Sequence, residues 1–234
     1  MANIDPVRRA EIGREKRART RAQLIAAAAK LFAKRAVESV TVDEVVEEAG
    51  VAKGTFYVHF EDLRALTTAV AEELVASFDD LLQPVRLSLK EPALRIAFGC
   101  SCFLDKALTD PGWAGVVARM VAAAPNGGEV ARHRVFEDLR AFSRGLPRGG
   151  ISPQLSLEIV AGIMLQLLSA IAEGRLTSRD REPAIEAILR AIGLDAGQVK
   201  SVLARVPARQ NLIADPATDD GPKPRRRPRA DRTA

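Results

Sequence analysis

The residues that most often carry out catalysis or bind metals are few in this sequence and are scattered along it. The chain has two histidines, His59 and His133, and two cysteines, Cys100 and Cys102. The sequence contains no zinc-ligand set, no serine with a plausible His-Asp set and no glycine-rich phosphate loop. We therefore expect no metal, no cofactor, no catalytic residue and no enzyme activity.

The two cysteines lie two positions apart in a segment whose pattern is helical. Residues with this spacing project from roughly opposite faces of a helix, so Cys100 and Cys102 cannot bond to each other. Their predicted role is that of two small buried apolar residues, and a redox sensor is the alternative.

No segment of the sequence predicts export or membrane insertion. The N-terminal residues lack the apolar stretch of a secretory signal. The longest apolar run, 159–172, is shorter than the roughly 20 residues that span a membrane. A cytoplasmic protein without a membrane partner is expected.

Charge is the feature that most clearly indicates a partner. The 234 residues include 35 Lys and Arg against 30 Asp and Glu, for a formal net charge of +5. Residues 1–21 hold seven bases against three acids, and residues 207–234 hold seven against four, so the body between them is close to neutral. The basic excess therefore belongs to the two ends and favours an anionic partner.

Apolar residues recur at helical spacing along the body of the chain, and no segment alternates convincingly like a β-strand. The stripe from Leu24 to Phe32 predicts a first helix, and residues 62–82 predict a longer one that ends before Pro84. Five or six further helices follow, with turns at residues 110–112, 125–128 and 146–150. The predicted fold class is all-α.

Residues 41–60, TVDEVVEEAGVAKGTFYVHF, predict a helix-turn-helix. Thr41 is the predicted N-cap of its first helix, and Gly50 can take the positive φ of the turn between Ala49 and Val51. A helical hairpin with glycine at its turn is also common in protein cores. On the second helix, 53–59, Phe56 and the following Phe60 face inward. The other faces of that helix carry Lys53, Thr55, Tyr57, Val58 and His59.

This stretch resembles the DNA-binding domain of the TetR family of bacterial transcriptional regulators. The resemblance spans about Arg21 to Leu66, and the rest of the chain is similar to the family in its helical layout alone. The matching residues are Leu31-Phe32, Thr41, Val45, Ala49-Gly50-Val51, Lys53-Gly54, Phe56-Tyr57, His59-Phe60 and Leu66.

The resemblance implies a role for each exposed residue of the motif. The second helix lies in the major groove, where Lys53 reaches a guanine edge or a phosphate and Gly54 permits close approach of the backbone. Thr55 and Tyr57 contact bases or phosphates. The remaining implied contacts are Val58 with a thymine methyl, and Thr41 and His59 with phosphate oxygens.

The sequence departs from the family pattern in three places. Ala36 stands where glycine usually ends the first helix, and Ala52 replaces a capping Ser or Thr at the start of the recognition helix. The fourth helix usually begins Ser-Lys but here begins Asp62-Leu63, in which Asp62 can cap and Leu63 cannot bind phosphate. Arg64 is a possible substitute for the lysine.

Both basic ends are candidate partners for the DNA backbone. The bases before the predicted first helix could follow the phosphates or enter the minor groove, and Arg17, Arg19 and Arg21 are the strongest candidates. A solvated terminus is the alternative for Arg8 and Arg9. The segment 223–229, KPRRRPR, is interpreted as part of a disordered solubilising tail, with an arm for anionic partners as the alternative.

Two late helices, about 153–173 and 181–192, are apolar beyond the needs of one core. The resemblance implies that they pair with a second copy into a four-helix bundle, so that a homodimer binds a palindromic operator. The residues weakly assigned to a ligand pocket, for each of which a place in the core is the favoured interpretation, are Phe98, Phe103, Trp113, Met120, Phe136, Phe142 and Met164.

The resemblance divides the chain into a basic arm (1–20), a helix-turn-helix DNA-binding domain (21–66), a helical ligand-binding and dimerisation domain (67–206) and a tail (207–234). It implies a ligand-responsive regulator, a repressor that an unidentified, largely apolar small molecule releases from its operator. The alternatives are a helical small-molecule-binding protein or enzyme with a vestigial DNA module, and a nonspecific DNA-binding protein that uses its arm and tail.

Overall fold

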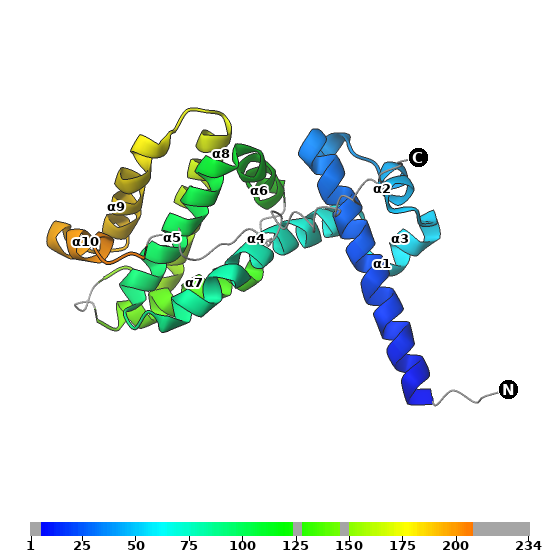
Figure 1. The fold of residues 1–234 in the computed structure, drawn as a ribbon, viewed down its shortest axis with the longest axis horizontal. Coiled ribbons are helices and arrows are strands. Elements are labelled where there is room, and N and C mark those ends of the chain that lie inside the picture. The colour runs from blue at the N-terminus through cyan, green and yellow to red at the C-terminus, as the bar shows by residue number, and fades with distance from the viewer. Residues whose placement is uncertain (1–5, 124–127, 146–149, 208–234) are drawn as a thin grey trace, which may run out of the picture.

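The computed structural model describes residues 6–123, 128–145 and 150–207. All regular elements within these ranges are helical, which confirms the predicted all-α class. A small N-terminal unit and a larger body lie at opposite ends of the molecule, and the long helix α4 (Leu63–Ser88) runs from one to the other (Figure 1).

The N-terminal unit is built from α1 (Pro6–Lys34), the short 3₁₀ turn η1 (Val37–Ser39), α2 (Val42–Ala49), α3 (Lys53–His59) and the start of α4. Its core contains fully buried side chains from each of these helices: Leu24 and Phe32, Val45, Phe56 and Leu66. Burial of such side chains contributes about 1.5 to 3 kcal/mol each, so these short helices are held mainly by their shared core.

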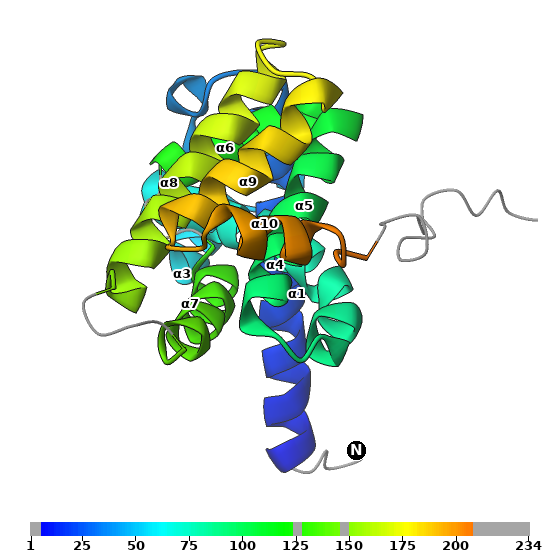
Figure 2. The same cartoon turned by 90° about the vertical axis from the view of Figure 1, so that its left-hand side faces the viewer.

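The prediction that the basic residues 8–21 precede the first helix is wrong. The helix α1 already begins at Pro6, and its first half projects away from the rest of the protein (Figures 1 and 2). This extension is rich in Arg, Ala, Glu and Lys, which favour a helix through their intrinsic propensity. It carries no apolar stripe, and for that reason hydrophobic periodicity does not detect it.

The body contains α5 (Pro92–Thr109), α6 (Pro111–Ala123), α7 (Glu129–Ser143), α8 (Pro153–Ala172), α9 (Arg181–Ala191) and α10 (Ala196–Leu203), with a 3₁₀ turn η2 (Ser178–Asp180) before α9. The main core is formed largely by α5, α6, α8 and α9. Figure 2 shows α8, α9 and α10 on the face of the body opposite the N-terminal unit. The turn predicted at 110–112 is present, whereas most of the other two predicted turns and the tail 208–234 lie outside the described residues.

The prediction that Pro84 ends its helix is also wrong, because α4 continues to Ser88. A proline inside a helix removes one backbone hydrogen bond and costs roughly 3 kcal/mol. The turn beyond Pro84 is held by Arg86, which is buried and bonded to Asp138 of α7. Tertiary contacts of α4 therefore outweigh the local preference of proline.

The apolar helix α8 is long enough, by length and composition alone, to cross a membrane. Core helices of globular proteins pass the same test. Here α8 packs against α5, α6, α7 and α9, and about a third of its most apolar stretch is buried within the protein.

Candidate nucleic-acid interface and ligand cavity

The start of α2 is fixed by a reciprocal capping box between Thr41 and Glu44. The Thr41 hydroxyl accepts from the Glu44 amide at 3.4 Å, and the Thr41 amide donates to the Glu44 carboxylate at 2.8 Å. This confirms Thr41 as the N-cap. Hydrogen bonds, first from Arg35 and then from Thr41, lower the pKa of Glu44 to about 2, so the carboxylate keeps its charge in this role.

The turn between α2 and α3 depends on Gly50. Its φ is 66°, in the left-handed region, as the sequence predicts. A side chain in that conformation costs about 1 to 2 kcal/mol. The Val51 amide then donates to the Val46 carbonyl at 3.0 Å, so the chain enters α3 at a fixed angle.

The helix α3 has one buried and one exposed face. Phe56 is fully buried and Phe60, which follows the helix, is nearly so, as predicted. Tyr57 and Val58 are 54% and 70% exposed, and the rings of Tyr57 and Phe56 pack edge to face with 5.2 Å between their centroids. Lys53 and Gly54 are exposed at the start of the helix, and Thr55 and His59 are partly exposed.

Lys53 is already paired within the protein. Its ammonium lies 2.8 Å from the carboxylate of Asp43 on α2, and the hydrogen bond to that carboxylate raises the pKa of Lys53. Both side chains are more than half exposed, so the pair is screened by water. Lys53 can therefore exchange Asp43 for another anionic acceptor at little cost.

The basic residues of α1 that are nearest to α3 lie beside its C-terminal end. The guanidinium of Arg21 lies over the ring of Phe60, 5.1 Å from its centroid. Arg14, Arg17 and Arg19 are exposed farther along the same helix. The surface around the end of α3 therefore continues into an exposed basic helix.

The structure shows the local geometry at each of the three departures from the family pattern. Ala36 has an extended backbone, with φ of −60° and ψ of 142°, so no glycine is required there. Ala52 precedes α3 without a side-chain cap, whereas Asp62 accepts from the Ala65 amide at 2.7 Å. Leu63 packs against the core of the N-terminal unit, and Arg64 is exposed.

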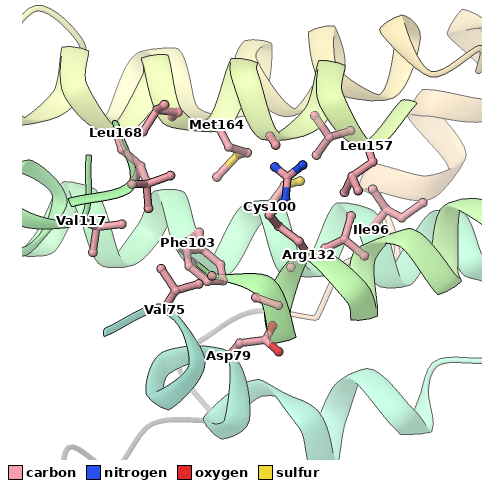
Figure 3. Close-up of a pocket in the computed structure, with 18 of the residues that line it drawn as sticks. Val75, Asp79, Ile96, Cys100, Phe103, Val117, Arg132, Leu157, Met164 and Leu168 are labelled. Atoms are coloured by element: carbon pink, nitrogen blue, oxygen red, sulfur yellow. The ribbon is translucent and has the colours of Figure 1, made fainter. Parts of the chain in front are cut away.

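A cavity of about 150 Å³ lies in the body, lined by residues of α4, α5, α6, α7 and α8 (Figure 3). Most of its wall is apolar. An engineered cavity of this size in another protein holds benzene, so the space suits a ligand of about one six-membered ring. The apolar side chains labelled in Figure 3 are Val75, Ile96, Phe103, Val117, Leu157, Met164 and Leu168.

One part of the cavity wall is charged. Asp79, which is 3% exposed, accepts from Arg134 at 2.5 Å and from Gln83 at 3.0 Å through one carboxylate oxygen. Its other oxygen has a contact with Arg86 at 3.5 Å, at the limit of a hydrogen bond. Asp79 is one of the residues that line the cavity, and Figure 3 shows it below the labelled apolar side chains. Asp79 can therefore accept a hydrogen bond from a ligand.

The arginines of the cavity are held by further carboxylates. Arg86 donates to Asp138 at 2.7 and 2.9 Å, and Arg95 donates to the same carboxylate at 2.6 Å. Arg132, which is labelled in Figure 3, pairs with Glu158 at 2.8 Å.

Only two of the seven residues assigned to a pocket from the sequence line this cavity, namely Phe103 and Met164. Trp113 packs beside it on Phe103, with ring centroids 6.0 Å apart. The others contribute to cores: Phe98 to a cluster with Phe78 and Leu82, Met120 to the core of the N-terminal unit, and Phe136 and Phe142 to the main core of the body.

The two cysteines are buried, as predicted. Cys100 lines the cavity, and burial raises the pKa of its thiol to about 12. A thiol with so high a pKa stays protonated near neutral pH and is a poor nucleophile, which disfavours the redox-sensor alternative.

These features define a helix-turn-helix protein whose body contains a mainly apolar cavity. The family model for bacterial regulatory proteins of the tetR family matches residues 24–70. The transcriptional regulator TtgR of Pseudomonas putida is 38% identical over 68 residues, which are 29% of this chain and 32% of that protein. The chain thus matches about a third of the length of the curated relatives that it resembles.

Solved structures extend the similarity to the body. The structure of RolR with its ligand resorcinol is 30% identical, covers 83% of this chain and 98% of that one, and has a TM-score of 0.64. FadR of Bacillus subtilis with stearoyl-CoA has a TM-score of 0.57 at 15% identity, covering 73% of this chain and 98% of that one, and so shares the fold alone. This chain belongs to the TetR family of bacterial regulatory proteins.

Proposed function

We propose that this protein is a transcriptional repressor that binds a palindromic operator as a homodimer and leaves it when a small molecule occupies the body. The observation that carries the proposal is the exposed face of α3. Its position is fixed by the Thr41 cap of α2 and by the turn at Gly50. Helix α4, which follows this unit, also lines the cavity of the body. A cytoplasmic location follows from this role.

The recognition helix α3 would lie in the major groove with its N-terminal end at the base edges. Lys53, Thr55 and Tyr57 are the side chains for base or phosphate contacts there, and Gly54 adds no side chain that would keep the backbone away. Val58 would meet a thymine methyl, and Thr41 and His59 would bind phosphate. Arg17, Arg19 and Arg21 would add backbone contacts through α1.

The exposed apolar side chains of α8 support the proposed dimer. Leu155 is 50% exposed, and Ile159, Ile163 and Leu167 are partly exposed, although the helix is apolar around most of its circumference. Pairing of the segments 153–173 and 181–192 with a second copy would cover this surface in a four-helix bundle. Two-fold symmetry then requires half-sites about 34 to 36 Å apart.

The proposed ligand is a single hydroxylated ring. The cavity volume of about 150 Å³ and its mainly apolar wall suit one aromatic ring, and Asp79 supplies an acceptor for a hydroxyl group. RolR, which is similar to this chain over most of its length, was solved with resorcinol, a ring of this size with two hydroxyl groups.

Selection of DNA duplexes from a random library tests the operator proposal. We expect the protein to enrich a palindrome, and Tyr57→Ala to lower the affinity for it by tenfold or more while binding to random DNA changes little. Leu87→Ala, which removes an exposed side chain at the far end of α4, is the control and should behave as the wild type. Equal losses on selected and random DNA would exclude base reading by Tyr57.

The same duplexes separate backbone contacts from base contacts. The triple variant Arg17→Gln, Arg19→Gln and Arg21→Gln should weaken binding to all sequences and reduce the salt slope by up to about 0.9 per lost phosphate contact. Arg140→Gln, on the exposed face of α7, is the control. A triple variant with an unchanged salt slope would show that α1 does not contact DNA.

Calorimetric titration of resorcinol and benzene tests the ligand class. A hydroxyl bonded to a buried carboxylate contributes about 1.5 to 3 kcal/mol, so resorcinol should bind roughly tenfold to a hundredfold more tightly than benzene. Resorcinol should then release the selected operator. Ligand binding by a protein that selects no duplex would support the alternative of a binding protein with a vestigial DNA module.

A further inference from the structure

Three charged residues of α4, spaced seven positions apart, bond to α7. Glu72, Asp79 and Arg86 thus lie on one face of α4, and their partners follow in the same order along α7. The three ties are Glu72 with the amides of Glu129 (2.5 Å) and Val130 (3.0 Å), Asp79 with Arg134 (2.5 Å), and Arg86 with Asp138 (2.7 Å).

Glu72 supplies the side-chain N-cap that α7 lacks at its own start. The N-cap residue Gly128 has no side chain to accept from the first amides of the helix, and its φ is 80°. The Glu72 carboxylate accepts from two of these amides instead, and its charge suits the positive end of the helix dipole. A Cβ at Gly128 would lie 3.4 Å from Val75, so the first turn of α7 rests directly on α4.

Glu72 lies where α4 passes from one core to the other. Val70 and Ala71, immediately before it, belong to the core that holds the recognition helix. Val75, three residues after it, belongs to the core of the body and lines the cavity. Gly128, the N-cap residue of α7, and Ala131 on α7 line the same cavity. The first turn of α7 therefore lines the cavity and also bonds to the part of α4 that directly follows the N-terminal unit.

We propose that Glu72 is a positioning residue that couples the cavity to the recognition helix. The inference rests on the proposed function of the cavity and of α3. A ligand that moves the first turn of α7 would move α4 with it through the two charge-assisted hydrogen bonds, because these bonds are directional. Without the carboxylate, the first turn of α7 can shift while α4 keeps its place, because the other two ties bond to later turns of α7.

A second connection between the body and the N-terminal unit limits the expected effect of removing Glu72. Helix α6 also reaches both parts, since Val117 lines the cavity while Val116 and Met120 pack in the core of the N-terminal unit. These contacts are mainly apolar, with one hydrogen bond from Arg119 to the Phe32 carbonyl at 3.3 Å. Loss of Glu72 should therefore weaken the coupling and not abolish operator binding.

Amide hydrogen exchange of α7 in the full-length protein, free and bound to the selected operator duplex, tests the proposal. In the wild type, operator binding should change the exchange rate of the Glu129 and Val130 amides by roughly fivefold, since coupling between two sites is reciprocal. In Glu72→Ala these amides should exchange fast in both states. Glu72→Gln, which keeps one acceptor oxygen, should fall between the two.

Operator affinity separates coupling from a merely structural cap. Glu72→Ala should bind the operator roughly fivefold more weakly, because a less restrained α4 loses more freedom on binding. The control is Glu73→Ala, which removes an exposed carboxylate from the next position. Two results would overturn the coupling while leaving the proposed function intact. In the first, Glu72→Ala exchanges its α7 amides faster but binds the operator as tightly as Glu73→Ala does. In the second, operator binding still changes the exchange of these amides in Glu72→Ala. A wild type that selects no duplex refutes the proposed function and the coupling with it.

Discussion

Replacing Asp138 with alanine is expected to lower the free energy of unfolding by about 3 to 5 kcal/mol. Asp138 is 7% exposed and accepts hydrogen bonds from both Arg86 and Arg95. Its removal leaves the Arg86 guanidinium buried without its two hydrogen bonds to Asp138. Arg86 then keeps its contact with the carboxylate of Asp79, at 3.5 Å. A buried cation that loses its partner keeps the full penalty of its lost hydration, which is the origin of the large effect. Urea unfolding followed by circular dichroism measures it.

Asp80→Ala is the matched control for this variant. It also removes an aspartate paired with an arginine, since Asp80 lies 2.7 Å from Arg134, but the Asp80 side chain is 62% exposed. A pair that water screens contributes about 0 to 1 kcal/mol, so the control should unfold nearly as the wild type does. Similar losses in the two variants would contradict the assignment of Asp138 to a buried network. The double variant Arg86→Met with Asp138→Leu should recover part of the lost stability, because it removes the buried charge together with its partner.

The helix-turn-helix could be predicted from the sequence because short-range chemistry determines it. Thr41 caps through a residue three positions away, Gly50 ends α2 by its own backbone conformation, and α3 spans Lys53–His59 as predicted. Each of these features depends on neighbours within one turn of helix. The exposed and buried faces of α3 follow in the same way from the positions of Phe56 and Phe60.

The charged wall of the cavity could not be predicted in this way. Asp138 lies 52 positions after Arg86 and 43 after Arg95, and no local pattern brings the three together. One signal was available: Asp79 and Arg86 interrupt the apolar face that Val75, Phe78 and Leu82 form on α4. A charge within an apolar stripe predicts a buried partner, although it does not say which one. The course of α4 beyond Pro84 depends on the same long-range contacts.

Replacing Gly99 with leucine should abolish ligand binding while it leaves the operator bound. Gly99 lies on α5 in the wall of the cavity, and a Cβ added there meets no atom within 4 Å. A leucine side chain would occupy much of the volume of about 150 Å³. Resorcinol would then have to displace packed atoms, so its affinity should fall roughly a hundredfold or more. The operator complex of this variant should resist release by resorcinol.

The same substitution should make the protein more stable by about 1 kcal/mol, because glycine inside a helix is disfavoured by that amount relative to good helix formers. Gly13→Leu makes the same change in α1, where a Cβ also meets no atom within 4 Å, and it should give the gain in stability without any loss of resorcinol affinity. Calorimetric titration and urea unfolding of the two variants together separate cavity filling from helix propensity. If Gly99→Leu binds resorcinol as tightly as Gly13→Leu does, the ligand binds elsewhere and the cavity between α4 and α8 has no part in release from DNA.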